Sequence, residues 1–259
     1  MYFKKHIIFK LQFRNWLSRA AFFGIMILFC ISCGSTGSNL SLQKKQLHQE
    51  GDKFLETLAL RYAPTIFLHE DEPLSISDII TVFHPERPFI AYHIFFEDDS
   101  WMLGRGKELD HEVMWVEYDP VTYKVKDVPV LWHRTVIRTN KCVLDANASQ
   151  QHPTVLIEWG QHGILPLGWE DLKGYRPVGE LKFHFELAKK GTFLQKTDTP
   201  VKFEGTKDEF KVFTKEFDPT EHIKKHKKIV ALYSKEELES LMGKGKFVVK
   251  KEWPFWSPN

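Results

Sequence analysis

The chain has 259 residues, of which 42% are hydrophobic and 27% are charged, a length that allows one sizeable domain or two small ones. Its 36 lysine and arginine residues nearly balance its 34 aspartate and glutamate residues, so the formal net charge is +2. A balance this close gives no reason to expect a nucleic-acid partner. The sequence holds no internal repeat, no low-complexity tract and no glycine-rich phosphate loop.

The first 32 residues have the layout of a secretory signal. Residues 1–19 carry five basic side chains and no acidic one, and residues 20–31 form an uncharged apolar stretch. As a helix this stretch rises about 18 Å, which is short of the roughly 30 Å hydrocarbon core of a membrane. We therefore expect a cleaved export signal over residues 1–32 rather than a permanent membrane span.

Cys33 lies directly after the small residue Ser32 and opens a Gly/Ser-rich stretch. This arrangement resembles a bacterial lipoprotein signal, in which the cysteine after a small residue is diacylated and becomes the new N-terminus. Cys30 departs from the common pattern, which has leucine at that place, and the alternative is a plain cleaved signal with an incidental cysteine. The resemblance implies a lipid on Cys33, a flexible tether over residues 33–39, and a lipoprotein anchored in the inner or outer membrane of a bacterial cell envelope.

Processing before Cys33 changes the composition of the mature chain. Removing the five basic residues of the signal from the total of 36 leaves 31 basic against 34 acidic residues, a net charge of −3. The slight excess of basic residues in the full chain therefore belongs to the signal. Cys30 is removed and Cys33 is acylated, which leaves Cys142 as the remaining thiol. A lone thiol forms no intramolecular disulfide, so the exported fold must be held together by its core.

Residues 40–259 are predicted to form a single domain that begins with a helix and continues in short strands. Apolar positions between Leu40 and Tyr62 fall at helical spacing, Gly51 weakens this helix and Pro64 ends it. Several later runs alternate in period two, which indicates strands with one buried face. Many short strands separated by turn residues predict a mainly β fold, an antiparallel β-sandwich with flanking helices. The expected strands are residues 65–68, 88–96, 113–118, 121–126, 128–133, 154–159, 181–187 and 209–217.

Two ionisable clusters border neighbouring strands in this prediction. Residues 97–99 (Glu-Asp-Asp) follow one strand, and Asp110, His111 and Glu112 open the next. If these strands pair as a hairpin, both clusters lie at the same edge of the sheet, with Asp110 and Glu112 on one face and His111 on the other. Carboxylates from two strand ends suit a hard cation such as Ca²⁺ or Mg²⁺. The alternative is that these acids are solvated residues at strand ends.

A glycine-flanked histidine lies later in the chain, in the segment EWGQHG (residues 158–163). His162 follows an apolar strand and stands between Gln161 and Gly163, where glycine permits close backbone approach or a positive φ. By itself, this segment is compatible with a structural turn or with a ligand.

Two further features lie towards the C-terminus. The basic segment HIKKHKK (residues 222–228) is compatible with contact to anionic lipid head groups or with a solvated connector. Ser234 and Glu237 then form a capping box, and Gly243 is placed to end the helix that follows.

Taken together, three segments resemble the vacuolar-protein-sorting-associated family found in fungi, plants and bacteria. LRYAPTIFLHEDEP (residues 60–73) resembles that family's opening, which reads YAP, a hydrophobic run and HPDE. GKELDHEVMWVEYD (residues 106–119) resembles its GDHEGDWE strand start, and EWGQHG resembles its later SQHGG. The acidic segment is also similar to the GHRHDWE segment of the necrosis-inducing, cytolysin-like proteins, which have a compact β-sandwich.

The resemblance implies a divalent cation held by acidic and histidine side chains at one edge of the sandwich. Asp110 and Glu112 match the acids of the DWE segment, Asp99 or Asp98 matches the acidic residue that ends the preceding strand, and His162 matches the histidine of QHGG. His111 stands where the family has tryptophan, and a shared fold does not carry function with it. The predicted metal ligands are Asp99, Asp110, Glu112 and His162, with Ca²⁺ or Mg²⁺ as the cofactor.

Three functions follow from these features, in order of preference. The first is a lipid-anchored envelope protein whose cation site orients a surface that binds a glycan, a lipid head group or a protein. The second is a structural envelope lipoprotein without a ligand, in which the strand-end acids keep the sheet edges soluble. The third is a metal-dependent hydrolase that uses the same carboxylates and His162 as ligands and acid/base groups at an ester or phosphate.

Overall fold

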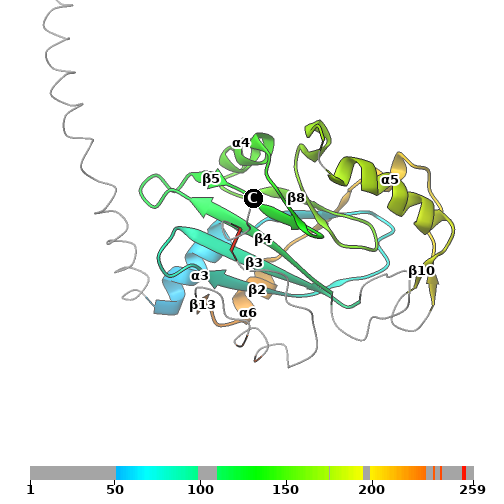
Figure 1. The fold of residues 1–259 in the computed structure, drawn as a ribbon. Coiled ribbons are helices and arrows are strands. Elements are labelled where there is room, and N and C mark those ends of the chain that lie inside the picture. The colour runs from blue at the N-terminus through cyan, green and yellow to red at the C-terminus, as the bar shows by residue number, and fades with distance from the viewer. Residues whose placement is uncertain are drawn as a thin grey trace, which may run out of the picture. The chain divides into compact units, whose positions relative to one another are not determined.

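The computed structural model describes residues 51–98, 110–174, 176–194 and 199–231, together with Glu236, Ser240, Trp253 and Pro254 (Figure 1). These residues all belong to one compact unit, Gln43–Asn259. The predicted signal, Cys33, the tether and Asp99 lie outside the described residues, as does most of the helix predicted to follow Ser234.

The described residues form a β-rich α+β fold in which two mixed sheets pack together. One sheet has the strand order β12-β1-β8-β9, and the larger one has the order β13-β2-β3-β4-β6-β7 with β5 paired to β4. The pairs β1–β8 and β13–β2 are parallel, whereas the other neighbours in these sheets are antiparallel. The predicted mainly β fold with flanking helices is therefore confirmed. The strands are β1 Thr65–Leu68, β2 Ile76–Phe83, β3 Phe89–Phe96, β4 Asp110–Tyr118, β5 Val125–Asp127, β6 Val130–Trp132, β7 Thr135–Ile137, β8 Thr154–Ile157, β9 Ile164–Pro166, β10 Phe193–Leu194, β11 Pro200–Val201, β12 Lys215–Phe217 and β13 Ile229–Val230.

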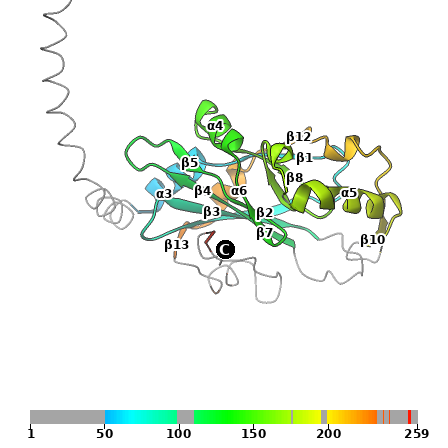
Figure 2. The same cartoon turned by 45° about the horizontal axis from the view of Figure 1, so that its top comes forward.

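Helices flank the sheets. The longest described helix, α5, lies beside the short β10–β11 hairpin, and α4 packs on β5 and β8 (Figure 1). Figure 2 shows the same arrangement from a second direction; α3 contacts α6, and α6 contacts β2. The helices are α3 Gly51–Arg61, α4 Asn140–Ala148, α5 Arg176–Lys189 and α6 Thr220–Lys225, with 3₁₀ turns η1 Trp169–Asp171 and η2 Glu209–Lys211.

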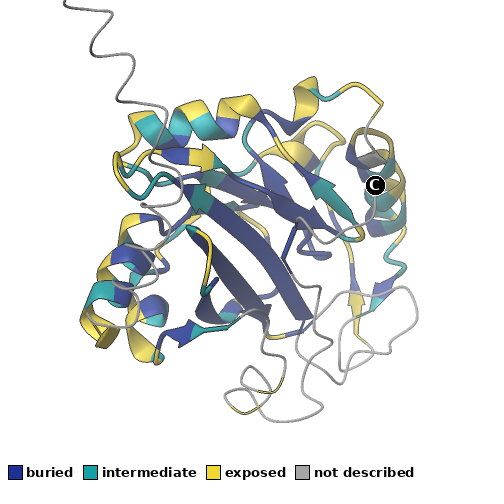
Figure 3. Cartoon of the chain, turned by 60° about the vertical axis from the view of Figure 1, so that its left-hand side comes forward, coloured by how far each residue is buried: buried dark blue, intermediate teal, exposed yellow. Residues whose placement is uncertain are grey.

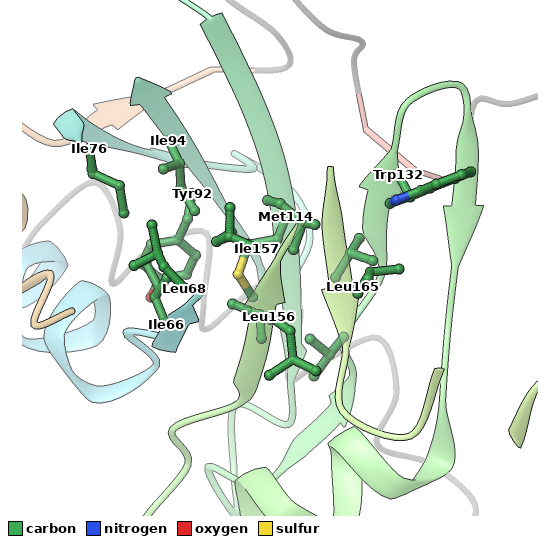
Figure 4. Packing of buried hydrophobic residues seen from close by; sticks show 14 of the residues in the cluster. Ile66, Leu68, Ile76, Tyr92, Ile94, Met114, Trp132, Leu156, Ile157 and Leu165 are labelled. Carbon is green, nitrogen blue, oxygen red and sulfur yellow. The ribbon is translucent and has the colours of Figure 1, made fainter. Parts of the chain in front are cut away.

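The core lies between the two sheets. The side chains labelled in Figure 4 come from both of them, for example Leu68 of β1, Ile157 of β8 and Met114 of β4, and all belong to one buried cluster. The central strands are buried along almost their whole length (Figure 3). The hydroxyl of Tyr92 on β3 donates a hydrogen bond of 2.8 Å to the Ala59 carbonyl, which ties helix α3 to the sheet.

The pairing of β3 with β4 decides where the acidic segments meet. The two strands are antiparallel, with Phe96 opposite Asp110. The end of β3 and the start of β4 therefore lie at the same edge of the sheet, as the sequence predicts. The buried Asp98 follows β3 at this edge.

One predicted strand, residues 181–187, is wrong, because this segment lies within helix α5. Its period-two alternation of polar and apolar residues favours a strand. The structure instead buries Leu181, Phe185 and Ala188, which are spaced by four and three residues on one helical face, and leaves Phe183 55% exposed. The apolar stripe continues beyond the alternating stretch, and that longer pattern is helical.

The segment 209–217 is also not one strand. Phe210 is buried in the 3₁₀ turn η2, Val212 is exposed, and pairing with β1 begins only at Lys215. The sequence prediction omits strand β2, whose apolar run is interrupted by the buried acid Asp78. It also omits α4, although Thr139 caps that helix by accepting a hydrogen bond from the Cys142 N–H.

Asp78 explains how the basic segment 222–228 is held. Its Oδ2 atom accepts hydrogen bonds from Lys225 Nζ at 2.8 Å and His226 Nε2 at 2.7 Å, and His222 lies 3.4 Å from Oδ1. Burial alone would raise the pKa of Asp78, but the bonds from Lys225 and His226 outweigh it and lower the pKa. This part of the basic segment is therefore connected to β2 through an ionised carboxylate.

We expect Asp78→Ala to lower the free energy of unfolding by about 3 kcal/mol at neutral pH, because it leaves Lys225 and His226 without their partner. Since the folded pKa of Asp78 is depressed, this contribution is present above about pH 4 and is lost as the pH falls through the lowered value. Urea denaturation of the wild type and the variant measures the difference. Glu221→Ala is the control. It removes an exposed ion pair with Lys224 in helix α6, which also carries Lys225, and should change stability by less than about 0.5 kcal/mol. Equal effects of the two substitutions would contradict this account.

Candidate metal centre

The loop that joins β8 to β9, residues 158–163, contributes to two histidine–carboxylate clusters. Backbone hydrogen bonds close it: the Glu158 N–H donates to the Gly163 carbonyl at 3.1 Å, and the His162 N–H donates to the Glu158 carbonyl at 3.0 Å. Gly160 and His162 have positive φ angles of 65° and 55°, so the backbone turns back sharply. Glu158 belongs to one cluster and His162 to the other.

The first cluster, which we call the His–Glu–His cluster, consists of His133, Glu158 and His184. His133 Nε2 donates to Glu158 Oε2 at 3.1 Å, and His184 Nδ1 forms a hydrogen bond with Glu158 Oε1. One possible ligand atom from each of the three side chains lies within 4.8 Å of the other two. Trp132 Nε1 also donates to Glu158 Oε2, at 2.8 Å, which fixes the carboxylate from a third direction.

Three separate parts of the chain position these ligand atoms. His133 follows β6 in a turn and has a positive φ of 51°, an unfavourable conformation for a residue with a side chain. Glu158 follows β8, and His184 lies in the second half of helix α5. The His133 and His184 rings meet edge to face with centroids 5.4 Å apart.

The His–Glu–His cluster is open to solvent on its histidine side. The side chains of His133 and His184 are 24% and 13% exposed, whereas that of Glu158 is fully buried. A buried carboxylate therefore lies beneath two partly exposed imidazoles.

Glu158 carries a negative charge at neutral pH. Burial alone would raise its pKa, but the hydrogen bonds from His133 and His184 outweigh burial and lower the pKa to about 2. An ionised carboxylate with two imidazole nitrogens is the mixed nitrogen and oxygen donor set that Zn²⁺ and related ions bind. A bound cation would replace the protons that now link the imidazoles to the carboxylate.

The second cluster, which we call the buried triad, consists of Glu72, His162 and Asp110. His162 Nδ1 donates to Asp110 Oδ2 at 2.8 Å, and Nε2 donates to Glu72 Oε1 at 3.3 Å. The imidazole is fully buried and stacks on the Phe96 ring, with centroids 3.8 Å apart and planes within 2°. Burial alone would lower the pKa of His162, but the two carboxylates raise it to about 10. His162 is therefore an imidazolium at neutral pH, with both ring nitrogens bonded to carboxylates.

The structure brings together Asp110 and His162, two of the four metal ligands predicted from the sequence. Glu112 is fully buried two residues further along β4, on the same face as Asp110, and Asp99 lies outside the described residues. In this arrangement both nitrogens of His162 already serve the triad. The four-residue Ca²⁺ or Mg²⁺ site stays a prediction, and it requires His162 to release a carboxylate.

Sequence reasoning does not find the His–Glu–His cluster. Glu158 lies inside the EWGQHG segment, yet only its histidine is selected there. His133 and His184 stand 25 residues before and 26 residues after Glu158, and no local spacing connects them. The interpretation of residues 181–187 as a strand also places His184 among surface residues, whereas the helix presents it to Glu158.

Comparisons with protein-family models, with curated proteins and with solved structures gave no match to this chain. Among the described residues, no helix is both long and apolar enough to cross a membrane. The resemblance to the vacuolar-protein-sorting-associated family stays a prediction, so the function must be argued from the site itself.

The buried triad should make a pH-dependent contribution to stability. Because the folded pKa of His162 exceeds the value of 6.5 for an unperturbed histidine, this contribution is complete below about pH 6.5 and is lost as the pH rises through about 10. We expect His162→Gln to be less stable than the wild type by about 3 kcal/mol or more near pH 6, because two buried carboxylates lose their cation. The difference should shrink steadily towards pH 10, as measured by urea denaturation across this range.

Tyr92→Phe is the control for this experiment. It removes a buried hydrogen bond from a hydroxyl whose pKa is raised well above its usual value, so its destabilisation should stay constant over the same pH range. A pH-independent destabilisation by His162→Gln would contradict an imidazolium at this position.

Proposed function

We propose that this protein is a lipid-anchored protein of the bacterial cell envelope that binds a Zn²⁺-type metal ion through His133, Glu158 and His184. The ion's remaining coordination position then binds a ligand. The observation that carries the proposal is the convergence of two imidazole nitrogens and one buried carboxylate within 4.8 Å at a partly exposed position. The envelope location rests on the signal-like sequence before Cys33.

The donor atoms favour a transition metal over Ca²⁺ or Mg²⁺. Ca²⁺ takes six to eight oxygen ligands, and Mg²⁺ prefers six in an octahedron. The His–Glu–His cluster offers nitrogen from His133 and His184 and oxygen only from Glu158. Imidazole is a good ligand for Zn²⁺, Cu²⁺, Ni²⁺ and Fe²⁺, and a four-coordinate Zn²⁺ would keep one position open.

The charge of the site indicates which ligands it would bind. A divalent ion with two neutral imidazoles and the Glu158 carboxylate keeps a net charge of about +1. An anionic oxygen ligand would neutralise this charge at the open position. A carboxylate of an envelope glycan and a phosphate of a lipid head group both meet this requirement. Among the ligand classes expected from the sequence, the charge therefore favours acidic glycans and lipid head groups.

Hydrolysis of an ester or a phosphate is a second candidate function. Two histidines and one glutamate match the ligand set of catalytic zinc sites, in which three protein ligands leave the fourth position to water. Binding of an anionic molecule is the preferred function because it needs only the three metal-binding side chains found in the structure. Turnover also needs a general base placed at the open position.

Addition of one equivalent of Zn²⁺ to the full chain in mild detergent should raise the melting temperature, and EDTA should reverse the rise, because an ion that binds only the folded state stabilises it. Native mass spectrometry should find one zinc ion per chain. We expect His133→Ala and Glu158→Gln each to weaken Zn²⁺ binding at least about 100-fold, since even partners outside the ligand set cost 10- to 100-fold.

His222→Ala is the matched control, because its side chain is 26% exposed and also faces a carboxylate, but at Asp78. It should bind Zn²⁺ as the wild type does. Absence of zinc binding by the wild type, or unchanged binding in both ligand variants, would contradict the proposed site. Ca²⁺ binding that depends on Asp99 and Glu112 instead would support the ligand set predicted from the sequence.

The anchor is tested separately. In a Gram-negative host, the wild type should fractionate with membranes and incorporate labelled fatty acid, whereas Cys33→Ala should lose the label and leave the membrane fraction. Cys30 lies within the expected signal, so Cys30→Ala should keep both the fatty-acid label and the membrane location. Lipid incorporation that persists in Cys33→Ala would show that Cys33 is not the acylated residue.

A further inference from the structure

We propose that the buried triad of Glu72, His162 and Asp110 is a positioning element for the metal ligand Glu158. It fixes the loop of residues 158–163 and thereby fixes the direction of the Glu158 carboxylate in the His–Glu–His cluster. This inference rests on the proposed metal site, and it assigns to the triad a role in that site beyond stabilising the core.

The triad holds the loop from two neighbouring segments. Glu72 lies between β1 and β2, and besides bonding the His162 ring its Oε2 atom accepts the Gly160 N–H at 2.8 Å. Asp110 opens β4 and accepts from the other side of the His162 ring. Trp159 adds a third attachment, because its Nε1 donates to the Asp71 carbonyl at 3.1 Å. Within residues 159–162, Trp159, Gly160 and His162 are thus hydrogen-bonded to segments outside the loop.

The backbone of the loop depends on these bonds. His162 has a φ of 55°, which costs free energy for a residue with a side chain and persists only where the surroundings enforce it. Its ring is held by two carboxylates and by stacking on Phe96. The strained turn also places the His162 N–H on the carbonyl of Glu158, so the conformation at His162 is transmitted directly to the ligand residue.

Packing at Gly163 leaves the Glu158 carboxylate little freedom to compensate. A Cβ atom at Gly163 would lie 2.7 Å from the Trp132 indole and 3.0 Å from Glu158 Oε2. The backbone at Gly163 therefore lies against both the metal ligand Glu158 and the Trp132 indole, which donates a hydrogen bond to Glu158. A shift of the loop towards Trp132 would displace the carboxylate from the two histidines.

The test uses Co²⁺, whose visible absorption reports the number and geometry of its ligands and which replaces Zn²⁺ in sites of this kind. The full chain is titrated with Co²⁺, and Zn²⁺ affinity is measured by competition. The wild type should give the intense visible bands of a four- or five-coordinate ion. His162→Asn, chosen because asparagine tolerates a positive φ, should bind about 10- to 100-fold more weakly and with a changed spectrum.

Glu72→Gln decides the question if His162→Asn does not fold, since it keeps all three metal ligands and the size of the side chain while removing the charge that holds the His162 ring. It should also change the Co²⁺ spectrum and weaken binding. Glu186→Gln is the matched control, because it makes the same change at an exposed position of α5, and it should bind as the wild type does.

The outcomes separate the two proposals. A wild type that binds neither Co²⁺ nor Zn²⁺ overturns the proposed metal site, and the positioning role with it. A wild type that binds Co²⁺, together with folded His162→Asn and Glu72→Gln proteins of unchanged spectrum and affinity, overturns the positioning role alone. Changed spectra in folded variants that retain all three ligands support it, because a triad that only stabilised the core would lower the melting temperature without altering the coordination of the ion.

Discussion

The candidate site depends on a buried imidazolium bonded to two carboxylates. Removing any charged group from water costs several kcal/mol, and the pairing of His162 with Asp110 and Glu72 offsets that cost within the core. The three residues come from the β8–β9 loop, the start of β4 and the connection between β1 and β2. One charged contact therefore links both sheets at the point where the loop turns back.

The two clusters differ in their exposure to solvent, which matters for binding an ion. The buried triad is enclosed by the core, and its imidazolium is already bonded to both carboxylates, which suits a permanent structural element. The His–Glu–His cluster has a buried acid beneath two histidines that reach solvent, which suits an ion that enters and keeps an open position. The six-residue loop connects a rigid interior to this accessible site, as a functional site on a rigid scaffold requires.

Much of the fold could be predicted from local patterns, whereas the site could be predicted only in part. The apolar runs of β1, β3, β4 and β8 specify their strands, and the pairing of β3 with β4 places residues 97–98 and Asp110 at one edge. Helix α5 is mistaken for a strand because Lys182 to Glu186 alternate in polarity while the burial stripe has helical spacing. The sequence highlights Asp110 and His162, which do meet. It cannot reveal that Glu72 completes their triad or that His133 and His184 converge on Glu158, because those contacts are set by tertiary packing between distant segments.

The most direct test of the account is X-ray absorption at the zinc edge of the full chain loaded with one equivalent of Zn²⁺. The account predicts a first shell at about 2.0 Å that mixes nitrogen and oxygen, with the outer-shell scattering of two imidazole rings, and the loss of that imidazole signal in a His133→Ala, His184→Ala double variant. A shell of oxygen atoms alone, or an imidazole signal that survives the double substitution, would contradict a metal centre built on His133, Glu158 and His184.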